Sequence, residues 1–187
     1  MTTHTTPKRR NAQKTKANIL IAAQKAFSNQ GYAHASIRDI AALAEVNSAL
    51  LLRYFGSKSG LFEAALIDAM RMDDLLQNGK EGFGEHLAKL FLNTELEITP
   101  PALIALATND PEAREITTRV IEEHVLPPVI KWLGAPDARA RAIQIMLLST
   151  AFVQYTRQLP KLFASRGASK KLANWFAQSI QAIVEQS

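Results

Sequence analysis

The residues with the clearest potential for chemistry lie in one segment, where the chain reads SIRDIAALAEVNSALLLRYFGSK from Ser36 to Lys58. Ser36 and Asn47 are of the types that cap helix N-termini. The apolar residues between and after them predict two short helices joined by a tight turn. A helix-turn-helix of this kind can place its second helix in the major groove of DNA. The chemistry expected here is therefore recognition of nucleic acid.

The second helix of the pair carries the side chains expected to meet base edges. Asn47, Ser48 and Ala49 stand at its N-terminal end, and Arg53 and Tyr54 follow about one turn later. The Arg53 guanidinium can fork onto guanine O6 and N7, a contact worth ~1–3 kcal/mol of discrimination. It can equally sit on a phosphate, and the sequence leaves these two roles open.

Other residues of the basic N-terminal part are expected to hold the DNA backbone. Ser36 begins a helix whose free backbone N–H groups can bind a phosphate. Lys58 stands in the first turn of the next helix, where a cation opposes the helix dipole and a phosphate would offset that cost. The remaining basic residues assigned to this interface are Arg38, Lys8, Arg9 and Arg10.

The charge distribution supports a phosphate-binding N-terminal unit. Residues 1–60 contain nine Lys or Arg and two acids, a balance of +7, whereas residues 61–187 contain 13 Lys or Arg and 15 acids, a balance of −2. A basic unit followed by a near-neutral one is typical of DNA-binding proteins with a separate second module.

The periodicity predicts an all-α protein of about nine helices, with no run that alternates as a strand does. We expect a disordered basic arm over 1–12, a three-helix helix-turn-helix domain over 13–60, and a helical ligand-binding and dimerisation domain over 61–187. Gly31 should end the first helix, and Pro127-Pro128 should kink or divide a later one. The expected helices cover about 13–30, 36–44, 47–55, 57–76, 84–97, 100–109, 110–134, 136–159 and 169–187.

Several function classes find little support in the composition. The chain has no cysteine, which fits a reducing cytosol. The polar, basic N-terminus lacks the apolar core of a secretory signal, and no apolar stretch is long enough to cross a bilayer. With four histidines and no HExxH or Glu-x-x-His pair, metal catalysis has few ligands. We therefore expect no enzyme activity, no catalytic residue, no metal, no cofactor and no membrane association.

Residues 17–61 resemble the DNA-binding domain of the TetR (tetracycline repressor) family of bacterial regulators. The matching positions are Ile19, Ala22, Ala23, Phe27, Gly31, Tyr32, Ser36, Ile37, Ile40, Ala41, Ala44, Val46, Leu51, Phe55, Lys58 and Leu61. Two positions depart from the family pattern: Glu45 replaces the usual turn glycine, and Leu52 replaces a tyrosine whose hydroxyl typically contacts phosphate.

The resemblance implies a cytosolic, nucleoid-associated homodimer that binds double-stranded DNA and represses transcription. The last two helices of each subunit would form a four-helix bundle, and a small-molecule effector would bind in the C-terminal domain. From the apolar stripes we assign the dimer interface to Ile145, Leu148, Phe152, Leu172, Trp175, Phe176, Ile180 and Ile183. The candidate effector pocket combines apolar, aromatic and imidazole side chains: Phe83, His86, Leu87, Phe91, Ile121, His124, Val125, Trp132, Phe152 and Tyr155.

Two alternatives remain from the sequence. One is a DNA-binding architectural factor that responds to no ligand. The other is a helical bundle that binds a small molecule or acts as an enzyme, with N-terminal helices that only pack. A ligand-responsive repressor on a near-palindromic operator remains the leading hypothesis, and an activator is the variant of it that the sequence leaves open.

Overall fold

The computed structural model describes residues 7–93, 95, 100–163 and 165–186 of the 187-residue chain. These residues form helices, turns and loops, which confirms the predicted all-α class. In chain order the elements are α1 (Pro7–His34), α2 (Ile37–Leu43), α3 (Ser48–Phe55), α4 (Lys58–Ala69), α5 (Asp73–Leu76), α6 (Phe83–Leu92), α7 (Pro100–Ala107), α8 (Pro111–Val120), the π-helical η1 (Ile121–Val125), α9 (Leu126–Leu133), α10 (Ala138–Gln158), the 3₁₀ turn η2 (Pro160–Phe163) and α11 (Arg166–Glu185).

Two of the predicted helices are divided, which explains why the described residues contain eleven α-helices where about nine were predicted. The helix predicted over 57–76 stops at Met70 and resumes as α5. The helix predicted over 110–134 becomes α8, η1 and α9, as the prediction of a break at Pro127-Pro128 required. Both prolines lack an N–H for the carbonyls four residues earlier, and the wider π turn precedes them.

The starts of the first and the last helix differ from those predicted. The structure begins α1 at Pro7, so the predicted disorder of the arm is wrong for residues 7–12, while residues 1–6 lie outside the described part of the chain. Proline suits the first turn of a helix because the N–H it lacks has no partner there. Gly31, with φ of 74°, breaks α1 as predicted. The last helix begins after Ser165, whose hydroxyl accepts a bond from Ala168 N at 3.3 Å, and not at Ser169.

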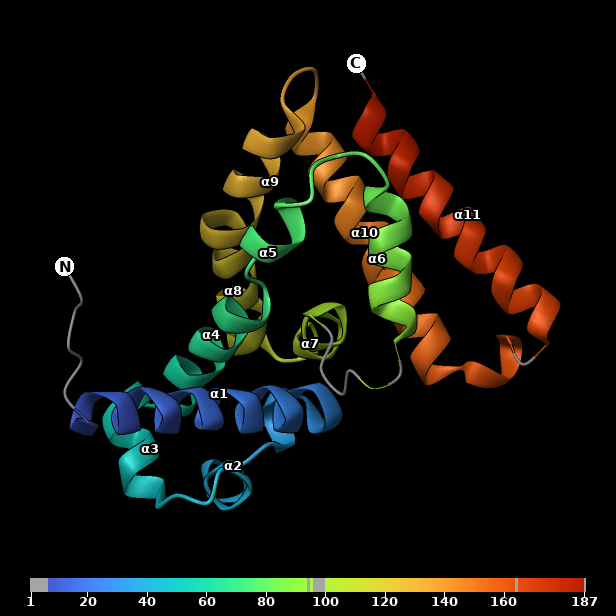
Figure 1. Cartoon of the computed structure of the whole chain (residues 1–187). Coiled ribbons are helices and arrows are strands. Elements are labelled where there is room, and N and C mark those ends of the chain that lie inside the picture. Colours follow the sequence, from blue (N-terminus) through green and yellow to red (C-terminus); the bar gives the residue numbers. More distant parts are fainter. Residues whose placement is uncertain (1–6, 94, 96–99, 164, 187) are drawn as a thin grey trace.

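The N-terminal helices share a hydrophobic core with the middle of the chain. Figure 1 shows α1 along the base of the molecule, with α2 and α3 on one side of it and the remaining helices on the other. Phe27 of α1, Leu51 of α3 and Phe62 of α4 belong to one buried cluster with Leu103 of α7 and Ala113 of α8. The division predicted at residue 60 therefore runs through a continuous core.

Two polar contacts fix α1 to the helices above it. The buried Gln24 amide donates to Ala65 O at 3.1 Å and to the Asp68 carboxylate at 3.0 Å, which joins α1 to α4. The Tyr32 hydroxyl donates to Glu112 at 2.6 Å, which joins the end of α1 to the start of α8. Because these bonds connect residues far apart in sequence, they fix the orientation of α1 in addition to its burial.

A second core lies among α6, α9, α10 and α11 and is closed by a buried arginine. Phe152 of α10 stacks on Phe176 of α11 with ring centroids 4.1 Å apart. Arg141 is only 2% exposed, and its guanidinium donates to backbone carbonyls of Leu133, Gly134, Pro136, Val184 and Gln186. Most of these carbonyls lie at the C-terminal ends of α9 and α11, where the helix dipole favours a cation. Arg141 thus satisfies its donors without a carboxylate.

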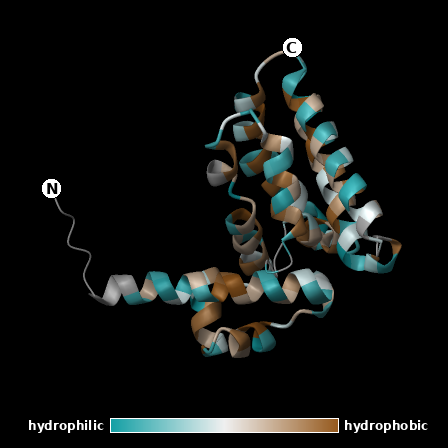
Figure 2. Ribbon diagram, turned by 45° about the vertical axis from the view of Figure 1, so that its right-hand side comes forward, coloured by the Kyte–Doolittle hydropathy of each residue, from teal (hydrophilic) through white to brown (hydrophobic). Residues whose placement is uncertain are grey.

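The crossing of α6 and α11 is unusually close because Gly84 has no side chain. A Cβ atom at Gly84 would stand 2.0 Å from the carbonyl oxygen of Ala177. Gln181 of α11 accepts a bond from Gly84 N at 3.0 Å and so replaces the side-chain cap that α6 lacks. The ribbon of α11 alternates between hydrophilic and hydrophobic residues (Figure 2), as expected of a helix with one buried face.

We expect Gly84→Ala to destabilise the fold, because the added methyl group forces α6 and α11 apart. Overpacking of this kind typically costs about 1–3 kcal/mol, and contact with backbone favours the upper end. The control is Gly167→Ala in the first turn of α11, where a Cβ meets nothing within 4 Å. That change should be neutral or stabilising by up to about 1 kcal/mol. Urea unfolding curves measure both, and equal stability of the two variants would contradict the close crossing.

Candidate functional site

The predicted helix-turn-helix is present as α2 and α3, each with the expected cap. Ser36 Oγ accepts from Asp39 N at 3.1 Å, and Asn47 Oδ1 accepts from Ala49 N at 2.8 Å. Glu45, in the turn between the helices, has φ of 55°. A left-handed conformation costs a non-glycine residue about 1 kcal/mol, so this turn carries the strain expected from the missing glycine.

The outer face of α3 is uncovered. Leu51 is fully buried and anchors the helix, whereas Ala49, Leu52 and Arg53 are exposed. Figure 1 places α2 and α3 at the edge of the molecule farthest from the C-terminal end of α11. The helix predicted to read DNA is therefore available to a partner. Leu52 was not among the predicted contact residues, although its spacing of three from Ala49 puts both on one face.

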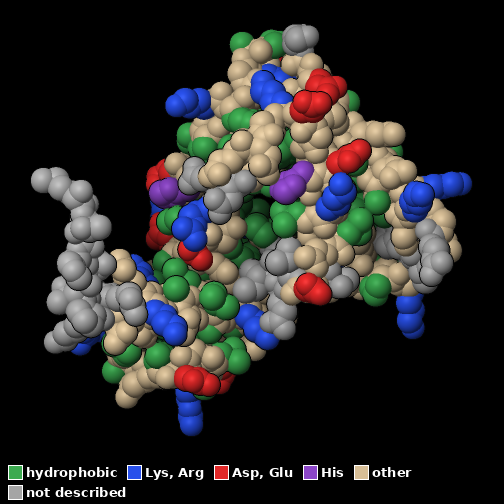
Figure 3. All heavy atoms as spheres, in the orientation of Figure 1, with side chains coloured by type: hydrophobic (Ala, Val, Ile, Leu, Met, Phe, Trp, Pro, Cys, Tyr) green, Lys and Arg blue, Asp and Glu red, His purple; other side chains and the backbone are tan. Residues whose placement is uncertain are grey.

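Two exposed arginines of this region are available to an external acceptor. Within the described part of the chain, Arg38 and Arg53 are exposed and have no ion-pair or hydrogen-bond partner. Lys16 of α1 approaches α3, with its Nζ 5.5 Å from the centroid of the Phe55 ring, and adds a cation that the sequence analysis missed. Lys and Arg side chains are spread over this part of the face in Figure 3, with few acidic side chains among them.

Two residues predicted to bind phosphate are engaged within the protein. Lys58 Nζ donates to Ala33 O at 3.2 Å and lies 4.6 Å from the centroid of the Tyr32 ring, so it closes the end of α1. The Ser36 hydroxyl donates to the Asp39 carboxylate at 2.6 Å, which places an acid at the N-terminus of α2. The Ser36 hydroxyl is thus engaged by Asp39, whereas the Lys58 ammonium keeps further donors.

The remaining predicted contact residues take different positions. Asn47 is exposed and Ser48 is half-buried at the start of α3, while Tyr54 is half-buried against the first core. Lys8, Arg9 and Arg10 belong to the first turns of α1, but their side chains are outside the described part of the structure.

The Tyr32 hydroxyl connects α1 to the C-terminal helices as a hydrogen-bond donor. Burial, and then the hydrogen bond and charge of Glu112, raise the pKa of Tyr32 well above its usual value near 10. Its ring lies 5.0 Å from the Phe62 ring of α4. A shift of α8 relative to α1 would therefore strain this partly buried hydrogen bond.

An apolar cavity of about 160 Å³ lies between the two cores. It is bounded by the C-terminal end of α4 and by α5, α6, α7, η1, α9 and α10. Four of the predicted pocket residues line it: Phe83, Leu87, Phe91 and Val125. Three methionines and two hydroxyl groups that also line the cavity were not among the predicted residues: Met70, Met72, Met146, Ser149 and Thr150. Its contact with the end of α4 makes it a candidate effector site.

The other predicted pocket residues lie elsewhere, so those predictions are wrong for this cavity. His86 and His124 are on exposed helix faces. Trp132 packs outside Phe83, with ring centroids 4.7 Å apart, and Ile121 packs between the cores without lining the cavity. Phe152 is stacked in the second core, and Tyr155 is exposed. Sequence position alone did not separate the inner from the outer side of these helices.

The predicted dimer interface also needs correction. Five of its eight residues are buried within one subunit and cannot provide the surface that a second copy meets: Ile145, Phe152, Phe176, Ile180 and Ile183. Leu148 and Leu172 are half-buried, and Trp175 is exposed. The large apolar residues that are exposed on α10 and α11 are Ile143, Leu147, Tyr155 and Trp175, and we call these four the subunit face.

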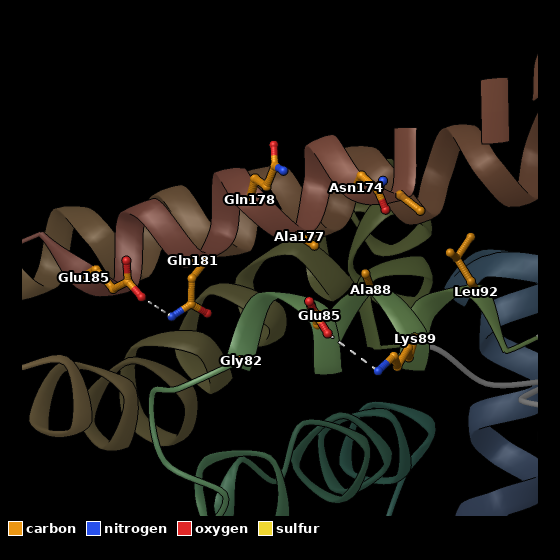
Figure 4. Close-up of a pocket in the computed structure, with 11 residues that line it drawn as sticks. Gly82, Glu85, Ala88, Lys89, Leu92, Asn174, Ala177, Gln178, Gln181 and Glu185 are labelled. Carbon is orange, nitrogen blue, oxygen red and sulfur yellow. Dashed lines mark hydrogen bonds and ion pairs between the residues drawn. The ribbon is translucent and has the colours of Figure 1, made fainter. Parts of the chain in front are cut away.

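A wider, polar groove of about 540 Å³ runs between α6 and α11 (Figure 4). Glu85 and Lys89 form an exposed ion pair at 3.7 Å along its α6 side, and Gln181 donates to Glu185 at 2.7 Å on α11. These polar groups satisfy one another, and the groove is open to water. It offers less to an apolar effector than the cavity between the cores does.

None of the described helices combines the length and apolar character needed to cross a bilayer. Comparison with solved structures shows the same fold in regulators of low sequence identity. A putative TetR-family transcriptional regulator from Rhodococcus sp. superposes with a TM-score of 0.71 at 16% identity, covering 92% of this chain and 100% of the other. NalD, the secondary repressor of the MexAB-OprM multidrug efflux pump in Pseudomonas aeruginosa, gives 0.57 at 18% identity, with coverage of 90% and 96%.

Sequence comparison points to the same family. The HTH-type transcriptional repressor NicS of Pseudomonas putida is 44% identical over 55 residues, a match that spans 29% of this chain and only 26% of that relative. Residues 19–65 match the family described as bacterial regulatory proteins, tetR family, and residues 81–184 match the tetracyclin repressor-like C-terminal domain. Because the second match alone covers more than half of the chain, this protein belongs to the TetR family of bacterial regulatory proteins.

Proposed function

We propose that this protein is a dimeric transcriptional regulator in the bacterial cytosol, bound at the nucleoid to a near-palindromic operator and released by a small, largely apolar effector. The observation that carries the proposal is the uncovered α3, whose exposed Arg53 has no partner among the residues described, on the basic part of the chain. A helix entering the major groove meets base edges with its exposed side chains, and surrounding cations hold the phosphates. Family membership and the name of the relative NicS support repression.

The subunit face supports a dimer. Along α10, a spacing of four or eight residues separates the apolar side chains Ile143, Leu147 and Tyr155. On the neighbouring helix α11, Trp175 is 52% exposed. A stripe of large apolar side chains on a soluble protein marks a contact surface. Two copies related by a two-fold axis would cover it with the same stripe and present two α3 helices to half-sites about 34–36 Å apart.

The cavity supports release by an effector through α4. This helix spans twelve residues, and its N-terminus adjoins α3 while its last residues line the cavity. An occupant that displaces Met70 would move α4, and α3 packs against α4. A dry apolar cavity of about 150 Å³ holds benzene, so a single aromatic ring fits the cavity of this protein. Flexible methionines allow a somewhat larger occupant.

The central test is a gel-shift titration with the DNA upstream of the protein's own gene, repeated at several salt concentrations. We expect nanomolar binding to one site, much weaker binding to scrambled DNA, and a steep salt dependence.

Arg53→Ala should relax the preference at one base position by ~1–3 kcal/mol per half-site. Lys58→Ala should weaken binding to all sequences and flatten the salt slope by about two for a dimer.

Lys131→Ala on α9 is the control for loss of one exposed positive charge far from α3. It should leave both affinity and slope unchanged. Lys58→Ala should also cost about 1 kcal/mol of folding stability, because the bond to Ala33 is lost, so stability is measured in parallel.

Absence of binding at low salt would support the helical-bundle alternative, and binding that ignores sequence would support the architectural factor.

We expect Leu147→Glu to produce monomers, because two carboxylates would face each other across the two-fold axis in an apolar contact. Leu147 is 65% exposed in the single subunit, so the change should not disturb folding. Sedimentation velocity measures the mass. Ile21→Glu on α1 is the control, an exposed apolar residue away from the subunit face. A dimeric Leu147→Glu protein would contradict this interface.

We expect Met146→Trp to abolish the response to the effector while operator binding stays within about threefold. The larger indole would occupy the cavity, at a stability cost of about 1–3 kcal/mol. Met146→Leu, which conserves volume, is the control. Thermal-shift titration with benzene as the probe should raise the melting temperature of the wild-type and Met146→Leu proteins only. An equal shift for Met146→Trp would place the binding elsewhere.

A further inference from the structure

The outer face of α3 carries an apolar pair beside its arginine. Leu52 is 41% exposed, and the exposed Ala49 stands one turn before it on the same face. The buried anchor of the helix is the neighbouring Leu51, so Leu52 is not needed for packing. A single exposed leucine is ordinary. Leu52 is of interest because it lies at the centre of the α3 face that is proposed to contact DNA.

The surroundings of Leu52 indicate which partner it would contact. Arg53 and Arg38 are exposed and without a partner among the described residues, and Asn47 stands at the start of the same helix. This charge draws α3 toward nucleic acid. A leucine has no donor or acceptor for phosphates or for the polar atoms of base edges. The one apolar group on the major-groove edge of a base pair is the C5-methyl group of thymine.

We propose, on the basis of the DNA-binding function proposed above, that Leu52 and Ala49 read thymine methyl groups in the major groove. Each preferred half-site then carries thymine under the centre of α3, next to the base or phosphate that Arg53 contacts. Residues three apart on a helix are separated by about 4.5 Å along its axis, and base pairs by about 3.4 Å. The pair therefore covers one or two adjacent thymines.

Replacement of thymine by uracil removes only this methyl group and tests the proposal directly. Once the operator is defined, each thymine of the half-site is replaced by deoxyuridine in turn, symmetrically in both half-sites, and affinity is measured by fluorescence anisotropy. For the wild-type protein we expect about fourfold weaker binding per half-site at one or two positions, the effect of losing one buried methyl group. For both half-sites together the loss is about fifteenfold.

The variants assign this effect to Leu52. Leu52→Ala should bind thymine DNA more weakly and no longer distinguish thymine from uracil at those positions, whereas Leu52→Met should retain much of the discrimination. Leu43→Ala, at an exposed leucine at the end of α2, is the matched control and should discriminate as the wild type does. Because Leu52 is exposed, the variants should fold normally, which circular dichroism checks.

Two results would overturn the proposal while leaving the regulator function intact: a wild-type protein that binds its operator but ignores every uracil substitution, or Leu52→Ala that keeps full discrimination. A protein that binds no DNA at low salt would overturn the proposed function and this inference together.

Discussion

The packing of α1 against α4 is the constraint on which the rest of the structure depends. Phe27 meets the Phe62 ring edge-on with centroids 5.0 Å apart, and the buried Gln24 amide holds two acceptors on α4. This arrangement supports α3 on its buried Leu51 and leaves the opposite face of that helix open. Since α4 also reaches the cavity with its last residues, the same contact joins the proposed DNA surface to the proposed effector site.

A second constraint closes the other end of the molecule. The Arg141 guanidinium is buried among backbone carbonyls at the ends of α9 and α11, so three separate segments meet at one side chain. Removing one partner of such a buried charge is costly, because the unpaired groups remain desolvated. Together with the close crossing at Gly84, this fixes α11 against α6 and determines which sides of α10 and α11 remain exposed.

The N-terminal unit and the C-terminal helices share the first hydrophobic core, and polar contacts at the end of α1 add to that packing. Tyr32 donates to Glu112 across the boundary, and Lys58 closes the end of α1 against the ring of the same tyrosine. In the free protein these groups are therefore structural. Binding of DNA or effector can bias the orientation of α3 only through differential contacts with the two arrangements, and the contacts of α1 and α4 with the helices above them are where such a difference would act.

Local sequence determined most of the helices and several of their starts. The caps at Ser36, Asn47 and Asp110 and the break at Gly31 depend on neighbouring residues alone, so they were predictable from one chain. The family resemblance of residues 17–61 was visible for the same reason. Only the tertiary structure decided which side of an apolar helix faces inward. In α10, Ile145 is buried and Leu147 exposed although both are apolar, because burial depends on helices distant in sequence. The cavity and the engagement of Ser36 and Lys58 within the protein arise from such distant contacts as well.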